Sequence, residues 1–366
     1  MNISLEKKKF IEAVSVVSRF AQHSSTTLPA LSSILIIAGD DGIKFRATNL
    51  ETGIDLKISG EKKTDGVVAI PAQILKNIAS SMSGEGSITL ENTGDIVLVK
   101  TGGAKSSIKT TPYDDFPAIS FPENPKHRVV LPGSVLRGLI TTIAPYASNS
   151  MVRPELSSIY LYIEGGVLTV VATDSFRLVE KKIPLQNKTT QSKVLIPAKN
   201  ALEIAQALPD EDIIVSFDDH QCAFIWSQGT LVSRLTNATY PDYHQIIPKE
   251  SIIEATLHRR DFENALKRAS IFSDAFQKIK IQFNPKEKSI TISSHNPDIG
   301  ESTEHLTAQL SGNPIELSFN HRYLSGVLPL TTAENITLSV SGIGRPLIMK
   351  GVGDTTVLYL VSPMNQ

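Results

Sequence analysis

Three weakly similar copies of one segment follow one another along the chain, and this repeat limits the possible folds more than any single motif. The sequence LSSI at 31–34 opens a strand-like run that ends in ATN at 47–49. LSSI at 156–159 opens another that ends in ATD at 172–174, so both landmarks recur after 125 residues. A fainter third copy ends at His295-Asn296, 122 residues after Asp174. Copies of this length are too long for solenoid units, so we expect each to form a domain with its own core, stacked on its neighbours through short linkers.

Each copy contains two helical patterns in the same order. The first pattern covers 5–20, 131–145 and 259–272, where apolar residues recur at helical spacing. The expected buried positions are Phe10, Val14 and Val17, then Val135, Leu139 and Ile143, then Phe262 and Leu266 with Ile271 near the end. The second pattern follows IPA at 70–72, IPA at 196–198 and FN at 319–320, and it predicts helices within 73–82, 199–208 and 321–330.

Alternating strand patterns fill the rest of each copy. Asp41-Gly42 and Gly165-Gly166 are expected hairpin turns, and 95–101, 222–228 and 355–361 are expected strands. The order helix, strands, helix, strands predicts an α+β fold with mainly antiparallel sheets and three similar domains. The expected domains are 1–122, 126–247 and 250–366, with linkers near 121–126 and 248–250. Identical head-to-tail contacts of this kind close into a ring when the rotation allows it.

Composition restricts the class of protein. The 366 residues are 41% hydrophobic and 20% charged, with a net charge of −1. This balance argues against a protein that grips DNA tightly, but not against one that surrounds DNA without many strong phosphate contacts. The single cysteine, Cys222, excludes an intrachain disulfide and is expected to be a buried thiol. No apolar run is long enough for a signal peptide or a membrane span, so a cytoplasmic protein without membrane contact is expected.

Sequence motifs for catalysis, metal binding or cofactor binding are absent. No Walker loop, Rossmann fingerprint, HExxH, nucleophile elbow or EF-hand loop occurs in the sequence. The eight histidines are scattered singly, and the carboxylate pairs Asp40-Asp41 and Asp218-Asp219 lie beside turn signals. We therefore expect no catalytic residue, no metal site and no cofactor.

Two segments are less ordinary. Residues 172–178, ATDSFRL, contain Arg177 and Leu178, which the matching segment of the first copy lacks. The C-terminal segment 359–366, YLVSPMNQ, is apolar although chain ends are usually polar and fray. A docked last strand and the rim of a partner-binding site explain this end of the chain equally well.

Four motifs together resemble one family. ATD at 172–174 with Arg177-Leu178, YPDY at 240–243 with Pro248, Phe319-Asn320 with Tyr323, and the Pro363-Met364 ending resemble the bacterial sliding clamp, the β subunit of DNA polymerase III. The resemblance implies a non-catalytic homodimeric ring of six similar domains that encircles double-stranded DNA without sequence preference. It also implies partners that insert a short motif rich in Gln, Leu and Phe between the second and third domains. These partners would be the polymerase catalytic subunit, the clamp loader, and other replication and repair proteins.

The resemblance assigns site residues position by position. The partner pocket would comprise Arg153, Leu156, Thr173, Asp174, Arg177, Leu178, Pro241, Ile246, Asn320, Tyr323, Val361, Pro363 and Met364. Ser175, Phe176, Gln245 and Pro346 depart from well-known members at the rim. The DNA channel would present basic residues on helices, chiefly Arg19, Lys76, Arg137 and Lys199. The dimer interface would join Ile271, Phe272, Glu301 and Glu304 to Ile78 and Lys105 of the second copy.

Two other classes compete with this interpretation. An enzyme would need a nucleophile, a base and a pocket that converge, and Asp174 would be the first residue to test. A peptide-binding scaffold without DNA would keep the pocket but would not stay on circular DNA. Retention on a nicked DNA circle, with loss after linearisation, separates this scaffold from a clamp.

Overall fold

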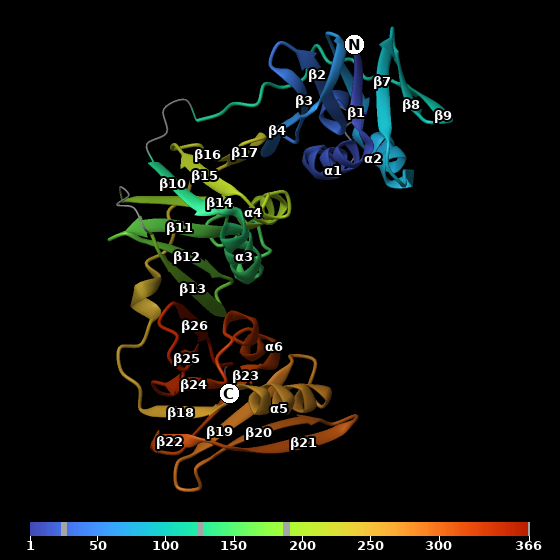
Figure 1. Cartoon of the computed structure of the whole chain (residues 1–366). Helices are drawn as coiled ribbons and strands as arrows, with labels where there is room; N and C mark the ends of the chain where they lie inside the picture. Colours follow the sequence, from blue (N-terminus) through green and yellow to red (C-terminus); the bar gives the residue numbers. More distant parts are fainter. Residues whose placement is uncertain (23–27, 123–126, 186–190, 365–366) are drawn as a thin grey trace. The chain divides into compact units, whose positions relative to one another are not determined.

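The computed structural model describes residues 1–22, 28–122, 127–185 and 191–364 (Figure 1). The chain divides into two compact units. The first contains Met1–Gly138 with Lys199–Leu235, and the second contains Leu139–Ala198 with Thr236–Gln366. Each unit is built from two sheets, and every strand pairing among the described residues is antiparallel, as expected for an α+β fold of this kind.

The first unit has a five-stranded and an eight-stranded sheet. The five-stranded sheet has the order β5-β1-β7-β8-β9, with bounds Gly60–Thr64, Asn2–Glu6, Ser87–Thr93, Ile96–Thr101 and Ala104–Lys109. The eight-stranded sheet has the order β10-β15-β16-β17-β4-β3-β2-β6. Its bounds are His127–Pro132, Asp212–Phe217, Gln221–Trp226, Gly229–Arg234, Thr52–Ile58, Gly42–Thr48, Ser33–Gly39 and Gly66–Pro71. Helices α1 (Lys7–Val17) and α2 (Ala72–Ser81) pack against each other in this unit.

The second unit has a nine-stranded and a four-stranded sheet. The nine-stranded sheet has the order β14-β11-β12-β13-β26-β25-β24-β18-β22. Its bounds are Ser192–Pro197, Ser158–Glu164, Val167–Thr173, Arg177–Pro184, Val357–Val361, Leu347–Gly351, Asn335–Val340, Ile253–His258 and Gln309–Gly312. The four-stranded sheet has the order β21-β20-β19-β23, with bounds Gly300–Thr307, Ser289–Asn296, Lys278–Asn284 and Ile315–Asn320. Helices α5 (Arg259–Ile271) and α6 (His321–Ser325) belong to this unit.

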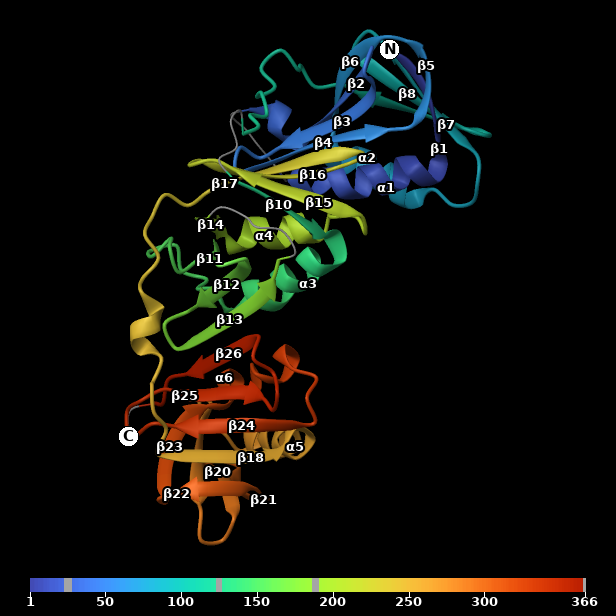
Figure 2. The same ribbon diagram turned by 60° about the vertical axis from the view of Figure 1, so that its left-hand side comes forward.

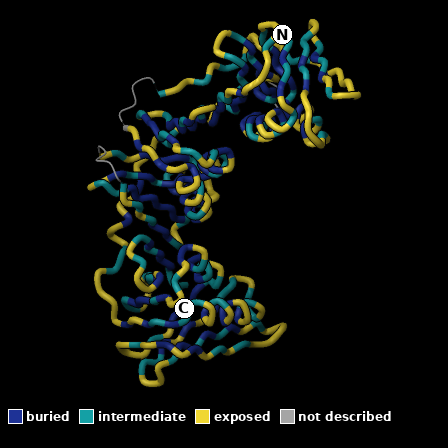
Figure 3. Tube along the Cα trace, in the orientation of Figure 1, coloured by how far each residue is buried: buried dark blue, intermediate teal, exposed yellow. Residues whose placement is uncertain are grey.

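Helices form where the sequence predicts them, with one face buried. On α1 the buried residues are Phe10, Ala13, Val14 and Val17, and on α5 they are Phe262, Ala265, Leu266 and Ala269. This is the spacing of one face of an amphipathic helix, and Figure 3 shows the exposed residues on the opposite faces. The two helices α3 (Gly133–Ile143) and α4 (Ala198–Ala205) also lie in the predicted segments.

Three details of the helix predictions are wrong. Val135 is exposed, because Leu136, one residue later, occupies the buried stripe of α3 with Leu139, Ile140 and Ile143. Ile271, predicted on the buried face of α5, is 63% exposed. The last predicted helix, 321–330, is shorter than expected: α6 ends at Ser325, and Leu328–Leu330 is a single 3-10 turn that includes Pro329. Proline at this position cannot continue a helix because it has no backbone N–H.

Sheet burial follows strand position. β19 alternates buried and accessible side chains, as expected for a strand with one face toward the core, whereas β12 is buried from Leu168 to Thr173. The predicted turns at Asp41-Gly42 and Gly165-Gly166 connect β2 to β3 and β11 to β12, and the predicted strands coincide with β8, β16 and β26. The hairpin predictions are therefore confirmed.

Neighbouring copies share sheets, which the sequence did not predict. β17 of the second copy pairs with β4 of the first, and β26 of the third copy pairs with β13 of the second (Figure 2). The ladder hydrogen bonds between β17 and β4 and between β26 and β13 join neighbouring copies directly. The prediction that the copies connect only through short linkers is therefore wrong. The residues of the second linker, 248–250, lie outside helices and strands. In the first linker, 123–126 lie outside the described residues, and the domain boundaries stay a prediction.

Other sequence predictions concern single groups. Cys222 is fully buried on β16, and burial raises the pKa of its thiol. Among the described helices, none is long and apolar enough to cross a membrane. In the described ranges, no three His, Cys, Asp or Glu side chains are arranged to hold a metal ion.

Candidate functional site

The loop between β12 and β13 is a tight turn held by its own side chains. Asp174 Oδ1 accepts hydrogen bonds from the backbone N–H groups of Phe176 and Arg177, both at 3.0 Å. Thr173 Oγ1 donates to the Arg177 carbonyl at 2.7 Å and accepts from the Ser175 N–H at 3.2 Å. Ser175 lies between them with a positive φ of 79°. The polar residues of ATD therefore shape the loop, and Asp174 Oδ1 is used to hold the backbone of the turn.

The first copy contains the same turn, which shows what is particular to the second. Asn49 Oδ1 accepts from the N–H groups of Glu51 and Thr52, and Leu50 has a φ of 74°. The two loops differ at the next positions, where Thr52-Gly53 stands in place of Arg177-Leu178. A Cβ on Gly53 would lie 3.1 Å from the side chain of Ile119. The chain itself therefore occupies, at the first copy, the space that a leucine would need.

Arg177 is the central charged group of the site. Its Nε donates to Asp174 Oδ2 at 2.9 Å, and its guanidinium lies 4.7 Å from the ring centre of Tyr146 and 5.1 Å from that of Tyr323. Burial alone would lower the pKa of this guanidinium, but Asp174 and Tyr359 together raise it above its ordinary value. Burial raises the pKa of Tyr146 to about 12. Arg177 is thus a fixed cation between neutral aromatic rings, a geometry that cation–π attraction stabilises.

The C-terminal segment is docked beside this turn. After β26 ends at Val361, the Ser362 N–H donates to the Phe176 carbonyl and the Met364 N–H to the Ser318 carbonyl, both at 2.8 Å. Pro363 and Met364 remain half-buried. The segment is therefore held through its backbone, while both side chains keep accessible surface. The docked end of the chain is therefore observed, and the rim of a partner-binding site stays a prediction.

The apolar residues of the expected pocket do not all lie on one face. Leu178 pairs with Leu360 across the β13–β26 ladder, and both belong to a cluster that includes Tyr240 and Tyr243. Val361 pairs with Arg177 on the opposite face and is fully buried. Because side chains alternate along a strand, Leu360 is the residue of β26 that shares a face with Leu178. Leu360 was not among the predicted pocket residues.

Some of the remaining residues of the expected pocket are exposed, and others are buried or bound to neighbouring groups of the chain. Pro241 and Ile246 are exposed on the connector 236–252, and Leu156 is buried. Asn320 caps α6, since its Oδ1 accepts from the Arg322 N–H at 2.9 Å, and its Nδ2 donates to the Phe276 carbonyl. Arg153 forms an ion pair with Glu155 at 2.9 Å.

The departures at the rim change its surface. Phe176 is 57% exposed and its ring stacks on Tyr323, with centroids 5.9 Å apart. Gln245 donates to Asp242 at 3.0 Å, and Pro346 is half-buried. The Phe176–Tyr323 stack thus adds an aromatic surface that a smaller or polar residue at position 176 would not give.

A buried network anchors the connector to the sheet. The Tyr243 hydroxyl donates to the Glu180 carboxylate and lies 2.9 Å from the Tyr162 hydroxyl, while Lys182 forms an ion pair with Glu180 at 2.9 Å. Burial, reinforced by the Glu180 carboxylate, raises the pKa of Tyr243 well above its ordinary value. The hydroxyl is therefore a hydrogen-bond donor at any physiological pH.

Replacing Tyr243 with phenylalanine is expected to lower the stability of the chain by about 1–2 kcal/mol, because Glu180 and Tyr162 lose a buried partner. Urea unfolding should show a lower midpoint with an unchanged slope. Tyr113→Phe is the matched control, since Tyr113 begins the corresponding segment of the first copy and is 43% exposed. Equal midpoints for the two variants would contradict this role of the network.

Some of the residues expected to face DNA are exposed, and others are bound to side chains of the same chain. Lys76 and Lys199 are exposed on α2 and α4. Arg19 donates to the side chain of Gln206, and Arg137 forms an ion pair with Asp210 at 2.6 Å. Lys76 and Lys199 are therefore the two of this set best placed to meet an external anion.

The expected interface residues of the second unit gather at the end of α5. Ile271 is exposed, and the Phe272 ring lies against Gly300. Ile299, 57% exposed, lies next to Gly300 and enlarges this apolar surface, and it was not predicted from the sequence. Asn296 Nδ2 donates to the Ser273 carbonyl at 3.1 Å, which fixes the turn containing Ile299 beside α5.

The charged interface residues are also placed. Glu304 is bound by Arg268 through two hydrogen bonds of 2.8 and 2.5 Å, and Glu301 is exposed, 3.8 Å from His295. In the first unit, Ile78 is half-buried on α2 and Lys105 is exposed on β9. Glu304 already has a partner within its own chain, so it is less available for a second copy than the sequence suggests.

Comparison with known proteins identifies the family. Three family models match in order: the DNA polymerase III beta subunit N-terminal domain over 1–120, the central domain over 130–242 and the C-terminal domain over 244–365. The chain belongs to the DNA polymerase III beta subunit family. Its three-domain fold, in which neighbouring domains share sheets, is therefore a beta subunit fold, and the family is non-catalytic.

Individual relatives agree over the full length. The chain is 28% identical to the "Beta sliding clamp" of Bacillus subtilis, covering 100% of this chain and 99% of that protein, and 26% identical to that of Vibrio cholerae, covering 100% of both. The crystal structure of the DNA polymerase sliding clamp from Bacillus subtilis has a TM-score of 0.93 at 26% identity, covering 100% and 99%. The Pseudomonas aeruginosa subunit beta has a TM-score of 0.94 at 24% identity, covering 100% of both chains, which shows a common fold.

Proposed function

We propose that this chain works as a DNA sliding clamp: two copies close a ring around duplex DNA and tether the replicative polymerase for processive synthesis. The full-length match to three consecutive beta subunit domains is the observation that supports this most directly. The relatives are named for clamping rather than for catalysis. The net charge of −1 suits a protein that encloses DNA and slides on it. A cytoplasmic location is part of the same proposal.

Partners are proposed to bind where Arg177 and the C-terminal segment meet. Leu178 and Leu360 form the buried apolar layer beneath the connector, and the exposed Pro241 and Ile246 with the half-buried Met364 supply apolar edges that a partner can reach. The comparison with the first copy supports this choice, since Gly53 and Ile119 fill the corresponding place there. A pocket with an apolar floor and a few fixed polar groups is typical of peptide recognition. The polymerase catalytic subunit, the clamp loader and other replication and repair proteins would use it.

The experiment that tests the function measures topology. The protein, loaded onto a nicked circular duplex by a clamp loader, should remain bound in moderate salt and be lost once the circle is cut, because enclosure needs a closed path. An isolated peptide-binding scaffold would bind its peptide, but its retention on circular DNA and on linear DNA would be the same. Equal retention on both forms would exclude a clamp.

Contact with the duplex is expected to be weak, salt-sensitive and independent of sequence. Replacing the exposed Lys199 with glutamate should reduce the loaded fraction about two- to threefold, since one phosphate contact among several is lost. Lys286→Glu, in the exposed turn between β19 and β20, is the matched control for charge. An equal effect of both substitutions would remove α4 from the proposed DNA-facing set.

A further inference from the structure

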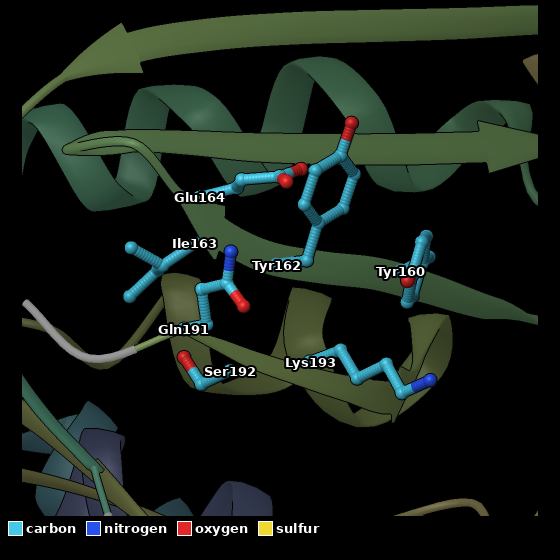
Figure 4. A pocket seen from close by; sticks show the side chains of 7 residues that line it. All are labelled: Tyr160, Tyr162, Ile163, Glu164, Gln191, Ser192 and Lys193. Atoms are coloured by element: carbon cyan, nitrogen blue, oxygen red, sulfur yellow. The ribbon is translucent and has the colours of Figure 1, made fainter.

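A hollow lies in the second unit, and its lining does not include the residues of the expected partner pocket. It has a volume of about 310 Å³ and is lined by Tyr160, Tyr162, Ile163, Glu164, Gln191, Ser192 and Lys193 (Figure 4). The lining comes from β11 and from the start of β14, the edge strand of the nine-stranded sheet. None of these residues belongs to the partner pocket described above. We call this hollow the tyrosine groove.

The tyrosine rings give the groove a rigid wall. Tyr160 stacks on Tyr240 with centroids 4.6 Å apart, and Tyr162 lies beside Tyr160 with centroids 5.1 Å apart. The Tyr162 hydroxyl is fixed by Tyr243 at 2.9 Å. Figure 4 shows the Tyr162 ring standing between Tyr160 and Glu164. One side of this ring is therefore turned toward a carboxylate, and hydrogen bonding and stacking hold it in place.

The groove is lined by one acidic and one basic side chain, Glu164 and Lys193. Both side chains are exposed, and no ion pair joins either of them to another residue in the described part of the chain. Lys193 pairs with Tyr162 across the β11–β14 ladder, so Glu164 lies two positions along β11 from it. Two positions along a strand are about 6.6 Å. In Figure 4 the Lys193 side chain extends away from Glu164.

An aromatic ring beside a carboxylate, as Tyr162 lies beside Glu164, is suited to binding a guanidinium group. An aromatic face attracts a guanidinium, and a carboxylate beside it can accept two parallel hydrogen bonds from the same group. Lysine could make the ion pair but not the planar stacking with two-point hydrogen bonding. The Gln191 side chain lies at the same end of the groove as Glu164 (Figure 4). The amide oxygen of the exposed Gln191 is a further acceptor for a guanidinium there.

We propose that the tyrosine groove binds an extended segment of a partner protein in which an arginine is followed two residues later by an acidic residue. The arginine would lie between Tyr162 and Glu164, and the acidic group would meet Lys193. Residues two apart in an extended chain point to the same side at the spacing that separates Glu164 from the Tyr162–Lys193 pair. The inference rests on this geometry and holds whether or not the clamp function is correct.

The groove also has a connection to the partner pocket. Tyr162 is bonded to Tyr243, and Tyr243 lies in the connector between the exposed Pro241 and Ile246. A partner with segments in both places would contact Tyr162 in the groove and the connector that Tyr162 helps to hold. Two linked contacts bind more tightly than either one because the second becomes intramolecular.

The test uses the full chain and a defined probe, the capped tripeptide acetyl-Arg-Ser-Glu-amide. Its dissociation constant, measured by NMR titration at low salt, should be in the millimolar range, as expected for a few exposed contacts. Glu164→Gln should raise this constant about fivefold, and Glu164→Lys should abolish binding, because the carboxylate that accepts from the guanidinium is lost. Glu250→Gln, which removes an exposed carboxylate elsewhere in the same unit, is the matched control.

A second peptide separates arginine recognition from general attraction. Acetyl-Gln-Ser-Glu-amide should bind about fivefold more weakly than the arginine probe, since it lacks the cation. Shifted resonances should include those of Tyr162 and Gln191. The proposal is overturned if the arginine probe does not bind at about 10 mM, or if Glu164→Gln and Glu250→Gln leave the same affinity.

Discussion

Replacing Ile271 and Phe272 together with alanine is expected to raise the dissociation constant of the proposed homodimer at least a hundredfold. Ile271 is 63% exposed at the end of α5, and the Phe272 ring lies against Gly300, next to the exposed Ile299. Large apolar side chains at the centre of an interface contribute most of the binding energy. Loss of two such anchors costs about 3 kcal/mol or more, and about 2.8 kcal/mol corresponds to a hundredfold.

Sedimentation velocity over a range of concentrations measures this change. The double variant should sediment as a folded monomer at concentrations where the unsubstituted chain is dimeric, with an unchanged circular dichroism spectrum. Val352→Ala is a suitable control, because Val352 is half exposed on a turn of the same unit, beyond the end of β25. A double variant that stays dimeric at the lowest concentration would show that the interface lies elsewhere, and the exposure of Ile299 would then be no evidence for this surface.

Most of the fold could be predicted from periodicity. Helix-forming stripes such as Phe10, Val14 and Val17 are local signals, and the tight turns at Asp41-Gly42 and Gly165-Gly166 set the hairpins. The pairing of β17 with β4 and of β26 with β13 could not be predicted in this way. Those strands are far apart in sequence, and nothing in their alternation distinguishes one edge partner from another.

The candidate site was predicted less completely, for a related reason. The resemblance places Val361 in the pocket, whereas the ladder register sets Leu360 opposite Leu178. A shift of one residue along a strand exchanges its two faces, so residue type alone cannot decide between them. Arg137 and Glu304 illustrate a second limit: each is bound within its own chain, to Asp210 and to Arg268. Sequence spacing gives no sign of either ion pair.

The tyrosine groove shows what the sequence did not reveal at all. Tyr160, Tyr162 and Tyr240 are separated by up to 80 residues, and only the fold of the connector stacks Tyr240 on Tyr160. The alternation of β11 places Tyr160, Tyr162 and Glu164 on one face. That pattern could have indicated an aromatic face with a carboxylate at its end.

Deletion of residues 362–366 is expected to weaken binding of a Gln-Leu-Phe type peptide at least tenfold. The truncation removes Pro363 and Met364, whose half-buried side chains border the proposed pocket, and leaves β26 complete through Val361. Loss of one apolar anchor worth about 1.4 kcal/mol suffices for a tenfold change. The domain cores do not include the deleted residues, so circular dichroism and dimerisation should hardly change.

A paired substitution separates the side chains from the docked backbone. Pro363→Ala with Met364→Ala keeps the chain length, and the backbone bonds from Ser362 to Phe176 and from Met364 to Ser318 can still form. If the tail is a rim of the pocket, this variant should lose most of the affinity that the deletion loses, measured by calorimetry at equal salt. If the truncated chain binds the peptide as well as the full chain does, the segment is only a docked end, and Leu178 and Leu360 would need another wall to form a pocket.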